Sequence, residues 1–367
     1  MPSTDAFAQW FLPSEKNVKK ITQNDAPDKL WKWSKEVYFK VKRGKNVQCL
    51  TCPNQCILEP NARSKCQSHV NKDGKLYTLV YGNPCAVHVD PIEKKPLYHF
   101  LPSSSVFSIA TTGCNFHCLN CQNWEISQVR PEDVRFMDMF PDAVVENVRE
   151  AGCRSIAYTY SEATTFYEYM LDTSRLARKA GVKNVWVSNG YMNKPPLLEL
   201  CKTLDAANID IKNFSEDIYS RLNAGRLKPV LRTLITLKEK GVWFEITVLV
   251  VPTYTDNMEM IRRMCEWILE NLGPDYPLHF SRFFPRYKLT HLPPTSIPFL
   301  ENARKTAMKM GIHYVYVGNV PQADSNHTYC PSCKNKIIER LGYLITENRI
   351  KNGRCSFCRQ PIAGVWE

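Results

Sequence analysis

Short apolar runs rich in β-branched and aromatic residues recur along the chain from about residue 105 onward. Such runs predict strands, here over residues 106–111, 155–160, 184–188, 207–211, 243–251, 278–284 and 314–317. Between them, apolar positions return at helical spacing, most clearly over 166–177 and 258–272. Strands that alternate with amphipathic helices are typical of βαβ units. We therefore expect a full or partial α/β barrel with its chemistry at the carboxyl ends of the strands, or alternatively an open doubly wound sheet.

The remaining segments lack this alternation and divide the chain into four predicted parts. Residues 1–44 mix aromatic residues and lysines without a clear period, and we interpret them as a lead-in. Residues 45–95 contain short turn-rich pieces and a group of cysteines, and residues 96–321 form the predicted barrel. Residues 322–367 contain a second cysteine group and are expected to form a small separate module.

No apolar run approaches the roughly 18–20 residues that cross a bilayer, and the amino end shows no export-signal pattern. We therefore expect no membrane segment and a location in the reducing cytoplasm. There, cysteines at short fixed spacing indicate metal ligands rather than disulfides. Of the fifteen cysteines, eleven fall into three groups. The others are expected to be small buried residues without chemistry, namely Cys85, Cys153, Cys201 and Cys265.

The formal net charge of +12 is compatible with a nucleic acid, an anionic cofactor or an acidic protein as partner. Thiolates that bind metal would cancel part of this charge. No basic ribbon interleaved with aromatic residues accompanies it. The charge is therefore weak evidence for nucleic-acid binding.

The most informative motif is C-x3-C-x2-C, formed by Cys114, Cys118 and Cys121 directly after the first predicted barrel strand. Its thiols are expected above the carboxyl end of that strand, where barrels keep their active sites. Three thiolates at this spacing can hold three irons of a [4Fe–4S] cluster and leave the fourth iron open for a substrate. The alternative is a zinc site completed by His117 or by a distant residue.

This motif, in a repeated β/α domain, resembles the radical S-adenosylmethionine (SAM) superfamily, close to the pyruvate formate-lyase activating enzyme branch. The stretches 90–100, 113–127, 157–165 and 279–287 are similar to the radical SAM enzymes of the AmmeMemoRadiSam system, and the resemblance covers roughly residues 45–367. It implies a partial (β/α) barrel of the radical SAM type, with small four-cysteine modules at its N- and C-terminal sides.

The resemblance also implies a mechanism and partners. SAM would chelate the open iron, and one electron passed into its sulfonium would give methionine and a 5′-deoxyadenosyl radical that abstracts hydrogen from a substrate. An electron donor such as flavodoxin or ferredoxin would supply the electron. Memo-like and AMMECR-like proteins are the expected functional partners, and the substrate is not identified.

Four further residues match SAM-binding positions of the superfamily or of this branch. Glu162 stands in the place of the Gly-Gly-Glu segment that contacts the methionyl amino group, and Asn189 stands in a segment that reaches the ribose or the carboxylate. Lys212 matches the branch's Asp-x-Lys, and His279 matches a histidine that approaches SAM. The alternatives are a structural carboxylate for Glu162, a solvated surface lysine for Lys212 and a satisfied core residue for His279, which is the more common role of a lone histidine on an apolar strand.

The chain departs from the family pattern at three places. The two glycines before Glu162 are absent, so the backbone there is expected to approach SAM differently. Val187 replaces an aspartate that helps to bind a monovalent cation. Asn120 replaces the aromatic residue that usually contacts the adenine, and Phe116 or Trp124 is expected to substitute for it.

Two groups of four cysteines flank the predicted barrel. The pairs in Cys330, Cys333, Cys355 and Cys358 have the spacing of a zinc ribbon or a rubredoxin-like site, and we expect a closed structural site that holds zinc rather than a single iron. The uneven spacing of the other group fits zinc and an auxiliary iron–sulfur cluster almost equally well, with zinc slightly favoured; its members are Cys49, Cys52, Cys56 and Cys66.

Three functions follow from these features. The leading hypothesis is an oxidoreductase-type radical SAM enzyme that abstracts hydrogen from an unidentified substrate. The second is an activase that forms a glycyl radical in a partner protein. The third is a basic zinc-module protein that binds nucleic acid, which would leave the three-cysteine motif unexplained.

Overall fold

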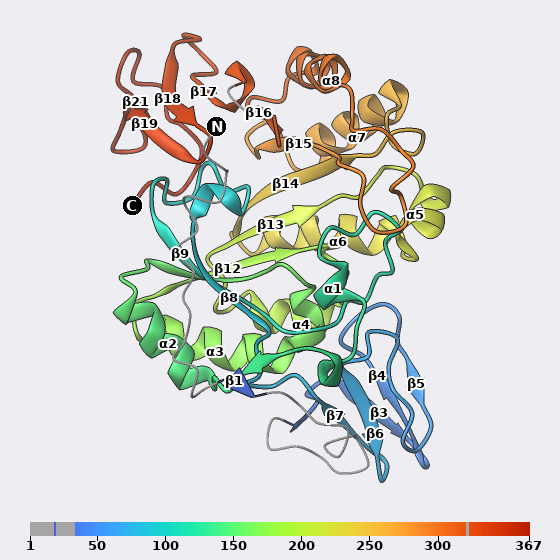
Figure 1. Ribbon diagram of the computed structural model, residues 1–367. Helices are drawn as coiled ribbons and strands as arrows, with labels where there is room; N and C mark the ends of the chain where they lie inside the picture. The colour runs from blue at the N-terminus through green and yellow to red at the C-terminus, as the bar shows by residue number, and fades with distance from the viewer. Residues whose placement is uncertain (1–17, 20–33, 321–322) are drawn as a thin grey trace. The chain divides into compact units, whose positions relative to one another are not determined.

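The structure is a computed structural model that describes residues 18–19, 34–320 and 323–367 (Figure 1). Most of the predicted lead-in, residues 1–17 and 20–33, lies outside the described residues. The chain forms two compact units. The first comprises the chain up to Asp90 together with Ser105–His117 and Asn123–Asp205, and the second comprises Pro91–Ser104, Cys118–Gln122 and Ala206–Glu367. The four-part division at residues 44, 95 and 321 stays a prediction.

The first unit contains the early strands of the predicted α/β pattern, in the order β12-β11-β9-β8. Strand β11 pairs in parallel with both β9 and β12, so that Ala157 lies opposite Ser108 on one side and Val185 on the other. Helices connect these strands and bury apolar stripes, as α2 does with Val144 and Val148. The elements are β8 (Ala86–Pro91), β9 (Ser105–Ala110), α1 (Trp124–Ser127), α2 (Pro141–Glu150), β11 (Ser155–Tyr158), α3 (Tyr167–Lys179), β12 (Lys183–Ser188) and α4 (Lys194–Leu200).

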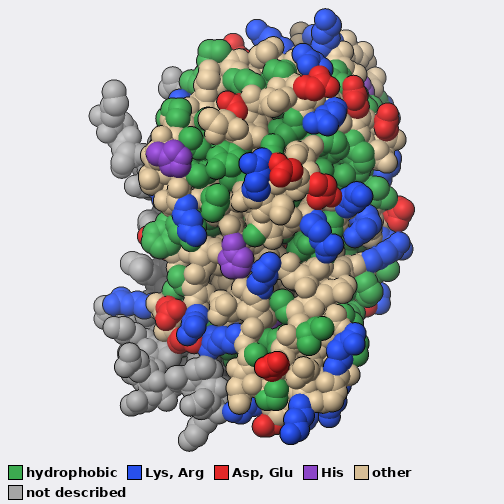
Figure 2. Space-filling model, turned by 90° about the vertical axis from the view of Figure 1, so that its right-hand side faces the viewer, with side chains coloured by type: hydrophobic (Ala, Val, Ile, Leu, Met, Phe, Trp, Pro, Cys, Tyr) green, Lys and Arg blue, Asp and Glu red, His purple; other side chains and the backbone are tan. Residues whose placement is uncertain are grey.

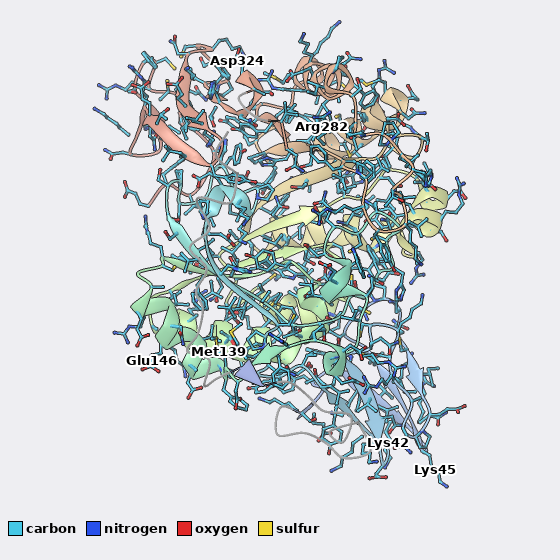
Figure 3. The ribbon with its side chains drawn as sticks, viewed as in Figure 1. Lys42, Lys45, Met139, Glu146, Arg282 and Asp324 are labelled. Atoms are coloured by element: carbon cyan, nitrogen blue, oxygen red, sulfur yellow. The ribbon has the colours of Figure 1, made fainter. Side chains whose placement is uncertain are left out.

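Small antiparallel sheets precede these strands, in the orders β3-β4-β5 and β2-β7-β6. Their buried side, with Val37, Val47, Leu58 and Leu76, also contains Cys49. Figure 3 shows Lys42 and Lys45 at the hairpin between β3 and β4, with their side chains pointing outward. The elements are β1 (Val18–Lys19), β2 (Lys35–Glu36), β3 (Lys40–Arg43), β4 (Asn46–Cys49), β5 (Ile57–Leu58), β6 (His69–Lys72), β7 (Lys75–Thr78) and β10 (Phe136–Met137), which pairs with β1.

The second unit continues the pattern with parallel strands in the order β16-β15-β14-β13. Nearly all of β14 is buried, as expected for a parallel strand covered on both faces. Asn257 caps helix α7, because its side chain accepts hydrogen bonds from two backbone N–H groups of the first turn. The elements are β13 (Ala206–Asp210), α5 (Glu216–Asn223), α6 (Leu227–Glu239), β14 (Trp243–Val250), α7 (Met258–Asn271), β15 (Leu278–Arg282), α8 (Ile297–Met310) and β16 (Val315–Gly318).

The C-terminal part of this unit consists of short antiparallel strands that carry the last cysteine group. They are β17 (Thr328–Tyr329), β18 (Lys336–Leu341), β19 (Leu344–Asn348), β20 (Ile350–Lys351) and β21 (Arg354–Cys355). Short 3₁₀ turns complete the described structure at η3 (Ile92–Lys94), η4 (Pro131–Asp133), η5 (Ala163–Phe166) and η6 (Asp324–Asn326). The expectation of an α/β fold with a large, mostly parallel sheet and a small C-terminal cysteine module is confirmed. In the described part of the chain, no helix is long and apolar enough to cross a bilayer.

Candidate active site and metal centres

The loop that begins the three-cysteine motif follows β9 and is fixed by neighbours in the first unit. The backbone N–H of Phe116 lies 3.4 Å from the Cys114 sulfur. The side-chain nitrogen of Asn189, just after β12, lies 3.9 Å from that sulfur and donates a 2.8 Å hydrogen bond to the side-chain oxygen of Asn115. Asn115 in turn donates to the carbonyl of Tyr191 at 2.9 Å. The structure thus brings Asn189 and Cys114 together, beyond the carboxyl ends of β12 and β9, the two strands that flank β11.

Gly113 sets the approach of this loop to the cysteine-rich N-terminal segment. Its φ is 100°, a value that favours glycine. A Cβ at this position would overlap the Ser68 hydroxyl oxygen and lie 2.7 Å from the Cys66 carbonyl oxygen. The Gly113 carbonyl accepts hydrogen bonds from the Thr165 hydroxyl at 3.3 Å and from the Glu162 backbone at 3.4 Å. No larger residue fits here without displacing the loop.

Glu162 is buried at the start of η5, and its carboxylate is well supplied with donors. One oxygen accepts from the Thr164 backbone at 2.9 Å, from the Thr164 hydroxyl at 2.6 Å and from the Ser188 hydroxyl at 2.7 Å. The other oxygen accepts from the Asn189 backbone at 2.9 Å. Burial raises the pKa of Glu162, although these donors counteract it. The second oxygen has capacity for another donor.

Tyr160 adopts, without being glycine, the backbone conformation that a glycine before Glu162 would adopt. Its φ is 63°, in the left-handed region that glycine normally occupies. The side chain of Asn123 donates a 2.7 Å hydrogen bond to its carbonyl, and its hydroxyl donates to the carboxylate of Asp90. These two partners hold a tyrosine in a backbone conformation that costs of order 1–2 kcal/mol. The backbone here is therefore glycine-like even though the sequence is not.

The remaining part of the motif lies in the second unit. The Cys118 sulfur is buried and accepts a 3.2 Å hydrogen bond from the side chain of Asn223. The ammonium of Lys212 forms a 2.5 Å ion pair with Asp210. Burial lowers the pKa of Lys212, but the charges of Asp210 and then Cys118 outweigh burial, so that its pKa is raised on balance. Burial raises the pKa of Cys118 to about 11, opposed by the charge of Lys212. The lysine therefore favours the thiolate form that a metal requires.

His279 is buried near the beginning of β15, and its Nε2 lies 2.7 Å from a carboxylate oxygen of Glu245. Glu245 also accepts from the backbone N–H groups of Tyr98 and His99, at 3.0 and 2.7 Å. Burial raises the pKa of Glu245, but the hydrogen bond and charge of His279 outweigh it and lower the pKa. The pair joins β14, β15 and residues 98–99. The assignment of His279 to SAM stays a prediction, whereas its partner Glu245 was missed, although a glutamate within an apolar strand was a signal for it.

The two aromatic residues expected to replace the adenine contact differ in accessibility. Phe116 is fully buried, with its ring 4.8 Å from that of Tyr191. Trp124 is 37% exposed, so its ring is the one that solvent reaches. Asn120 is itself buried. The assignment of Phe116 or Trp124 to the adenine stays a prediction.

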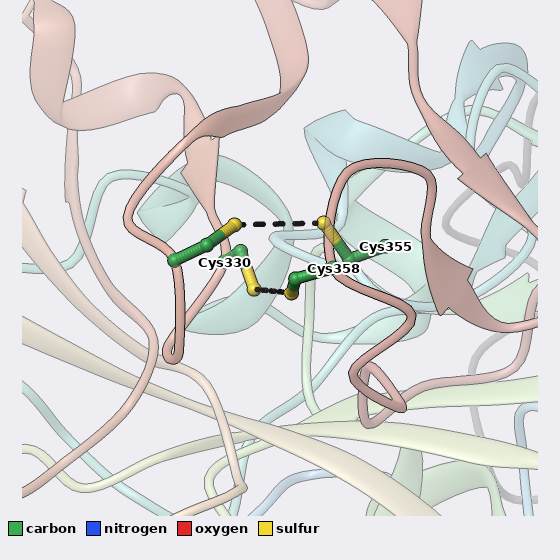
Figure 4. Close-up of side chains that lie close together, drawn as sticks. Cys330, Cys355 and Cys358 are labelled. Atoms are coloured by element: carbon green, nitrogen blue, oxygen red, sulfur yellow. Dashed lines mark hydrogen bonds between the residues drawn. The ribbon is translucent and has the colours of Figure 1, made fainter.

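The C-terminal cysteine group has the geometry of a single-ion site. In the described part of the chain, its sulfur atoms form the one group of metal-ligand atoms that all lie within 4.8 Å of one another. The Cys330 and Cys358 sulfurs are 3.6 Å apart, and the Cys333 and Cys355 sulfurs are 3.8 Å apart (Figure 4). A tetrahedron with Zn–S bonds of about 2.3 Å has edges of about 3.8 Å. The site therefore fits one tetrahedral ion.

This group is also part of a hydrophobic core. Cys330 and Cys355 are buried in a cluster with Tyr98, Tyr314 and Tyr316. Such a position is typical of a structural metal site, because the metal and the core stabilise the same small module.

The N-terminal cysteines line one pocket in the first unit, together with His69, Asn115, Thr164 and Thr165; they are Cys49, Cys52, Cys56 and Cys66. The Nδ1 atom of His69 lies 3.8 Å from the Cys49 sulfur. Burial raises the pKa of Cys66, but the charge of His69 outweighs it and lowers the pKa to about 7. His69 was not among the residues predicted from the sequence. Its position three residues after Cys66 could have indicated that it belongs to this cysteine group.

The solitary cysteines behave largely as expected. Cys153 and Cys265 are buried, and Cys85 and Cys201 are partly buried. Burial raises the pKa of Cys265 to about 12 and that of Cys153 to about 11, so both are protonated thiols at neutral pH. No chemistry is assigned to them.

Comparison with known proteins shows which family and structures the chain is similar to. Residues 108–268 match the family model described as the radical SAM superfamily. An uncharacterized protein of Methanocaldococcus jannaschii is 44% identical over 331 residues, which cover 89% of this chain and 98% of that protein. The pyruvate formate-lyase 1-activating enzyme of Escherichia coli is 24% identical over 159 residues, or 42% of this chain and 65% of that enzyme. A radical SAM methyltransferase structure from Sphaerobacter thermophilus aligns with a TM-score of 0.48 at 10% identity, covering 79% of this chain and 78% of that one.

Proposed function

Since the chain belongs to the radical SAM superfamily and to the same family as the Methanocaldococcus protein, we propose that Cys114, Cys118 and Cys121 hold a [4Fe–4S] cluster at which SAM is cleaved reductively. When bound, the cluster and SAM supply a 5′-deoxyadenosyl radical for hydrogen abstraction. The observation that carries this proposal is the C-x3-C-x2-C motif itself, placed directly after β9 within the matched domain. The donor set fits the cluster, because three thiolates leave one iron open.

The residues around the motif have complementary tasks in this proposal. Asn189 fixes the loop at Cys114, and the free acceptor capacity of Glu162 suits the amino group of SAM. Lys212 offsets negative charge at Cys118 and on the SAM carboxylate. His279 supports β15 through Glu245 and is proposed to act on SAM more weakly than Lys212.

The C-terminal cysteines are proposed to hold a structural zinc ion, on the tetrahedral sulfur spacing described above. A donor of the flavodoxin or ferredoxin class is proposed to supply the electron. We also assign the chain to the AmmeMemoRadiSam system on the matching stretches quoted from the sequence, with Memo-like and AMMECR-like proteins as partners and the cytoplasm as location. The hydrogen donor is a substrate still to be identified.

One observation favours a second candidate, a glycyl-radical activase. The similarity to the Escherichia coli activating enzyme extends over 42% of this chain. The nucleic-acid hypothesis has less support. On the face shown in Figure 2, lysine and arginine side chains are interspersed with acidic and neutral ones instead of forming a continuous stripe.

Anaerobic reconstitution with iron, sulfide and SAM tests the proposal. We expect 5′-deoxyadenosine and methionine to form only with a one-electron reductant. Absence of both products from protein that holds a full cluster would contradict the proposal. An activase would in addition leave a stable radical on a large partner protein.

A further inference from the structure

The N-terminal cysteine pocket, defined by Cys49, Cys52, Cys56, Cys66 and His69, is a buried site with unusual chemistry. Cys49 and Cys66 are almost fully buried, and His69 is 2% exposed. The Nε2 atom of His69 has no hydrogen-bond partner within the described residues. A buried ring nitrogen without a partner is costly, and so is the mutual repulsion of several thiolates in one pocket. Both features are explained if the pocket holds a group that these side chains bind.

The N-terminal cysteines gather less closely than the C-terminal cysteines do. The C-terminal cysteines already form a compact single-ion cage, with all ligand atoms within 4.8 Å of one another. Among the described residues, the N-terminal cysteines do not meet that criterion, although they line one pocket. Thiolates of an iron–sulfur cluster bind different irons and therefore stand farther apart than ligands of one ion. The pocket thus favours a cluster over a single zinc ion.

The pocket is in direct contact with the three-cysteine loop. Gly113, the residue before Cys114, packs so closely on the Cys66 carbonyl that a side chain there would collide with it. The Ser68 hydroxyl donates to the Thr112 carbonyl at 3.2 Å. On the other side of Cys114, the Asn115 carbonyl accepts a 2.8 Å hydrogen bond from the side chain of Asn54.

Asn115 also lines the pocket, and its side-chain oxygen is bonded to Asn189. The backbone on both sides of Cys114 is therefore anchored to the segment that carries the N-terminal cysteines. A structural zinc ion does not need to lie close to Cys114. A redox centre does, because electrons pass only between centres that are close together.

We propose that Cys49, Cys52, Cys56 and Cys66 bind a redox-active iron–sulfur cluster, and that this cluster passes electrons to the cluster at Cys114. The proposal rests on the function proposed above. In each transfer the N-terminal cluster is oxidised by one electron and the cluster at Cys114 is reduced by one electron. A donor of the flavodoxin or ferredoxin class then reduces the N-terminal cluster again. No bond is formed and no proton is required in the transfer.

His69 acts in this site as a positioning residue. One ring N–H donates to a thiolate of the cluster, which stabilises the extra negative charge of the reduced state. Hydrogen bonds to cluster sulfurs are among the determinants of reduction potential. Loss of the imidazole should therefore lower the potential of the N-terminal cluster without removing iron.

The first experiment isolates the N-terminal cluster. The variant Cys114→Ser, Cys118→Ser, Cys121→Ser is reconstituted anaerobically as the full chain, and its iron, sulfide and zinc are measured. We expect iron and sulfide to remain, with an EPR signal after reduction that does not respond to SAM. Zinc without iron in this variant would overturn the proposal. Failure of the wild-type protein to show any SAM-responsive signal would overturn the proposed function instead, and iron retained in the variant would still support the N-terminal cluster.

The second experiment tests electron transfer. Variants of the two partly exposed pocket cysteines, Cys52→Ser and Cys56→Ser, are compared with the solitary-cysteine variant Cys201→Ser. We expect reduction of the SAM-responsive cluster by reduced flavodoxin to slow at least tenfold in the pocket variants and to stay unchanged in Cys201→Ser, while dithionite reduces it in all three. Equal rates with flavodoxin would overturn the relay.

A third measurement addresses His69 in protein that keeps its iron. We expect His69→Ala to retain the iron and sulfide of the wild type and to show a lower midpoint potential for the N-terminal cluster in a redox titration. His69→Gln, which keeps an N–H donor, should restore part of the difference. An unchanged potential in His69→Ala would contradict the role assigned to His69.

Discussion

The side-chain nitrogen of Asn189 donates a 2.8 Å hydrogen bond to the side-chain oxygen of Asn115, the neighbour of Cys114. The side-chain oxygen of Asn189 accepts from the Tyr191 backbone at 2.9 Å, so both ends of the amide are engaged. The end of β12 thereby fixes the loop that begins the three-cysteine motif. Each such hydrogen bond contributes about 0.5–1.5 kcal/mol to the order of the loop.

Replacement of Asn189 by alanine should therefore loosen this loop. We expect Asn189→Ala to reconstitute with less iron than the wild type and to bind SAM roughly tenfold more weakly, since about 1–2 kcal/mol of ordering free energy is lost. Iron analysis and a SAM titration check this. Asn184→Ala, at the other end of β12, is the control for general destabilisation. Equal iron content and SAM affinity in Asn189→Ala and wild type would contradict the role of Asn189.

Lys212 should contribute more to SAM affinity than to cluster assembly. Under the proposed function, the Lys212→Ala variant lacks one charge-assisted hydrogen bond to the SAM carboxylate, and we expect a cost of about 1.5–3 kcal/mol, or roughly tenfold to a hundredfold in affinity. EPR of the reduced cluster during a SAM titration measures this loss. Lys202→Ala is the matched control, because its side chain is 69% exposed and pairs with Glu199 at the surface. Identical affinities of the two variants would show that Lys212 does not contact SAM.

The sequence was sufficient for the α/β pattern and insufficient for the long-range polar contacts. Predicted strands such as 106–111 and 243–251 coincide with β9 and β14 within one residue at each end, because buried parallel strands consist of near-continuous apolar residues. The N-terminal sheets were not predicted in detail. Strands such as β3, with three charged residues in four, show no apolar alternation.

The candidate cysteines could be predicted from the sequence, whereas most of the residues that contact them could not. Short fixed spacing identifies Cys114 and its partners without any fold, since metal ligands in one loop are local in sequence. The contact between Asn189 and Asn115 joins residues 74 positions apart, and the one between Glu245 and His279 joins residues 34 apart. Such pairs depend on strand order, which periodicity does not give.

The conformation of Tyr160 provides a test of the glycine-like backbone before Glu162. Tyr160→Phe removes the hydroxyl that binds Asp90 but leaves the backbone strain, so we expect it to destabilise the protein by about 1–2 kcal/mol. Tyr160→Gly removes both the strain and the hydrogen bond. The release of backbone strain should offset part of the stability that is lost with the side chain. Thermal unfolding of both variants measures the difference. A Tyr160→Phe variant as stable as the wild type would contradict the role of the bond to Asp90.

The buried histidine His99 predicts a pH dependence of stability. Burial lowers the pKa of His99 to about 4, against an ordinary value of 6.5. Between these two pH values the unfolded chain binds a proton at His99 that the folded chain does not. The contribution of His99 to stability is therefore fully present above about pH 6.5 and is lost as the pH decreases towards 4. The difference amounts to roughly 3 kcal/mol at most. Denaturant unfolding at pH 7, 6, 5 and 4 follows it.

The exposed His313 serves as the control for this titration, because its side chain is 40% exposed and bonded to Asp275 at the surface. His99→Gln should flatten the pH dependence between 6.5 and 4, and His313→Gln should not. If the free energy of unfolding of His99→Gln fell with decreasing pH as steeply as that of the wild type, or more steeply, His99 would not be the source of the pH dependence.

The C-terminal metal should act on the fold rather than on the chemistry. Replacing Cys330 and Cys355 by serine removes two of four thiolates from a buried cluster, so we expect a lower melting temperature and lower solubility. SAM cleavage per folded molecule should change much less. Zinc analysis, calorimetry and product formation on the same samples compare the two effects. A stably folded variant that binds SAM normally but has lost cleavage would show a role beyond structure.

The most direct test of the central claim is EPR of the reduced cluster with and without SAM, in wild-type protein and in the variants Cys114→Ala and Cys85→Ala. Cys85→Ala is the matched control, since this solitary cysteine is partly buried and carries no assigned chemistry. We predict a [4Fe–4S] signal that changes on addition of SAM in the wild type and in Cys85→Ala, and that is absent from Cys114→Ala together with 5′-deoxyadenosine formation. A SAM-responsive signal and wild-type turnover in Cys114→Ala would contradict the assignment of the radical SAM site to this motif.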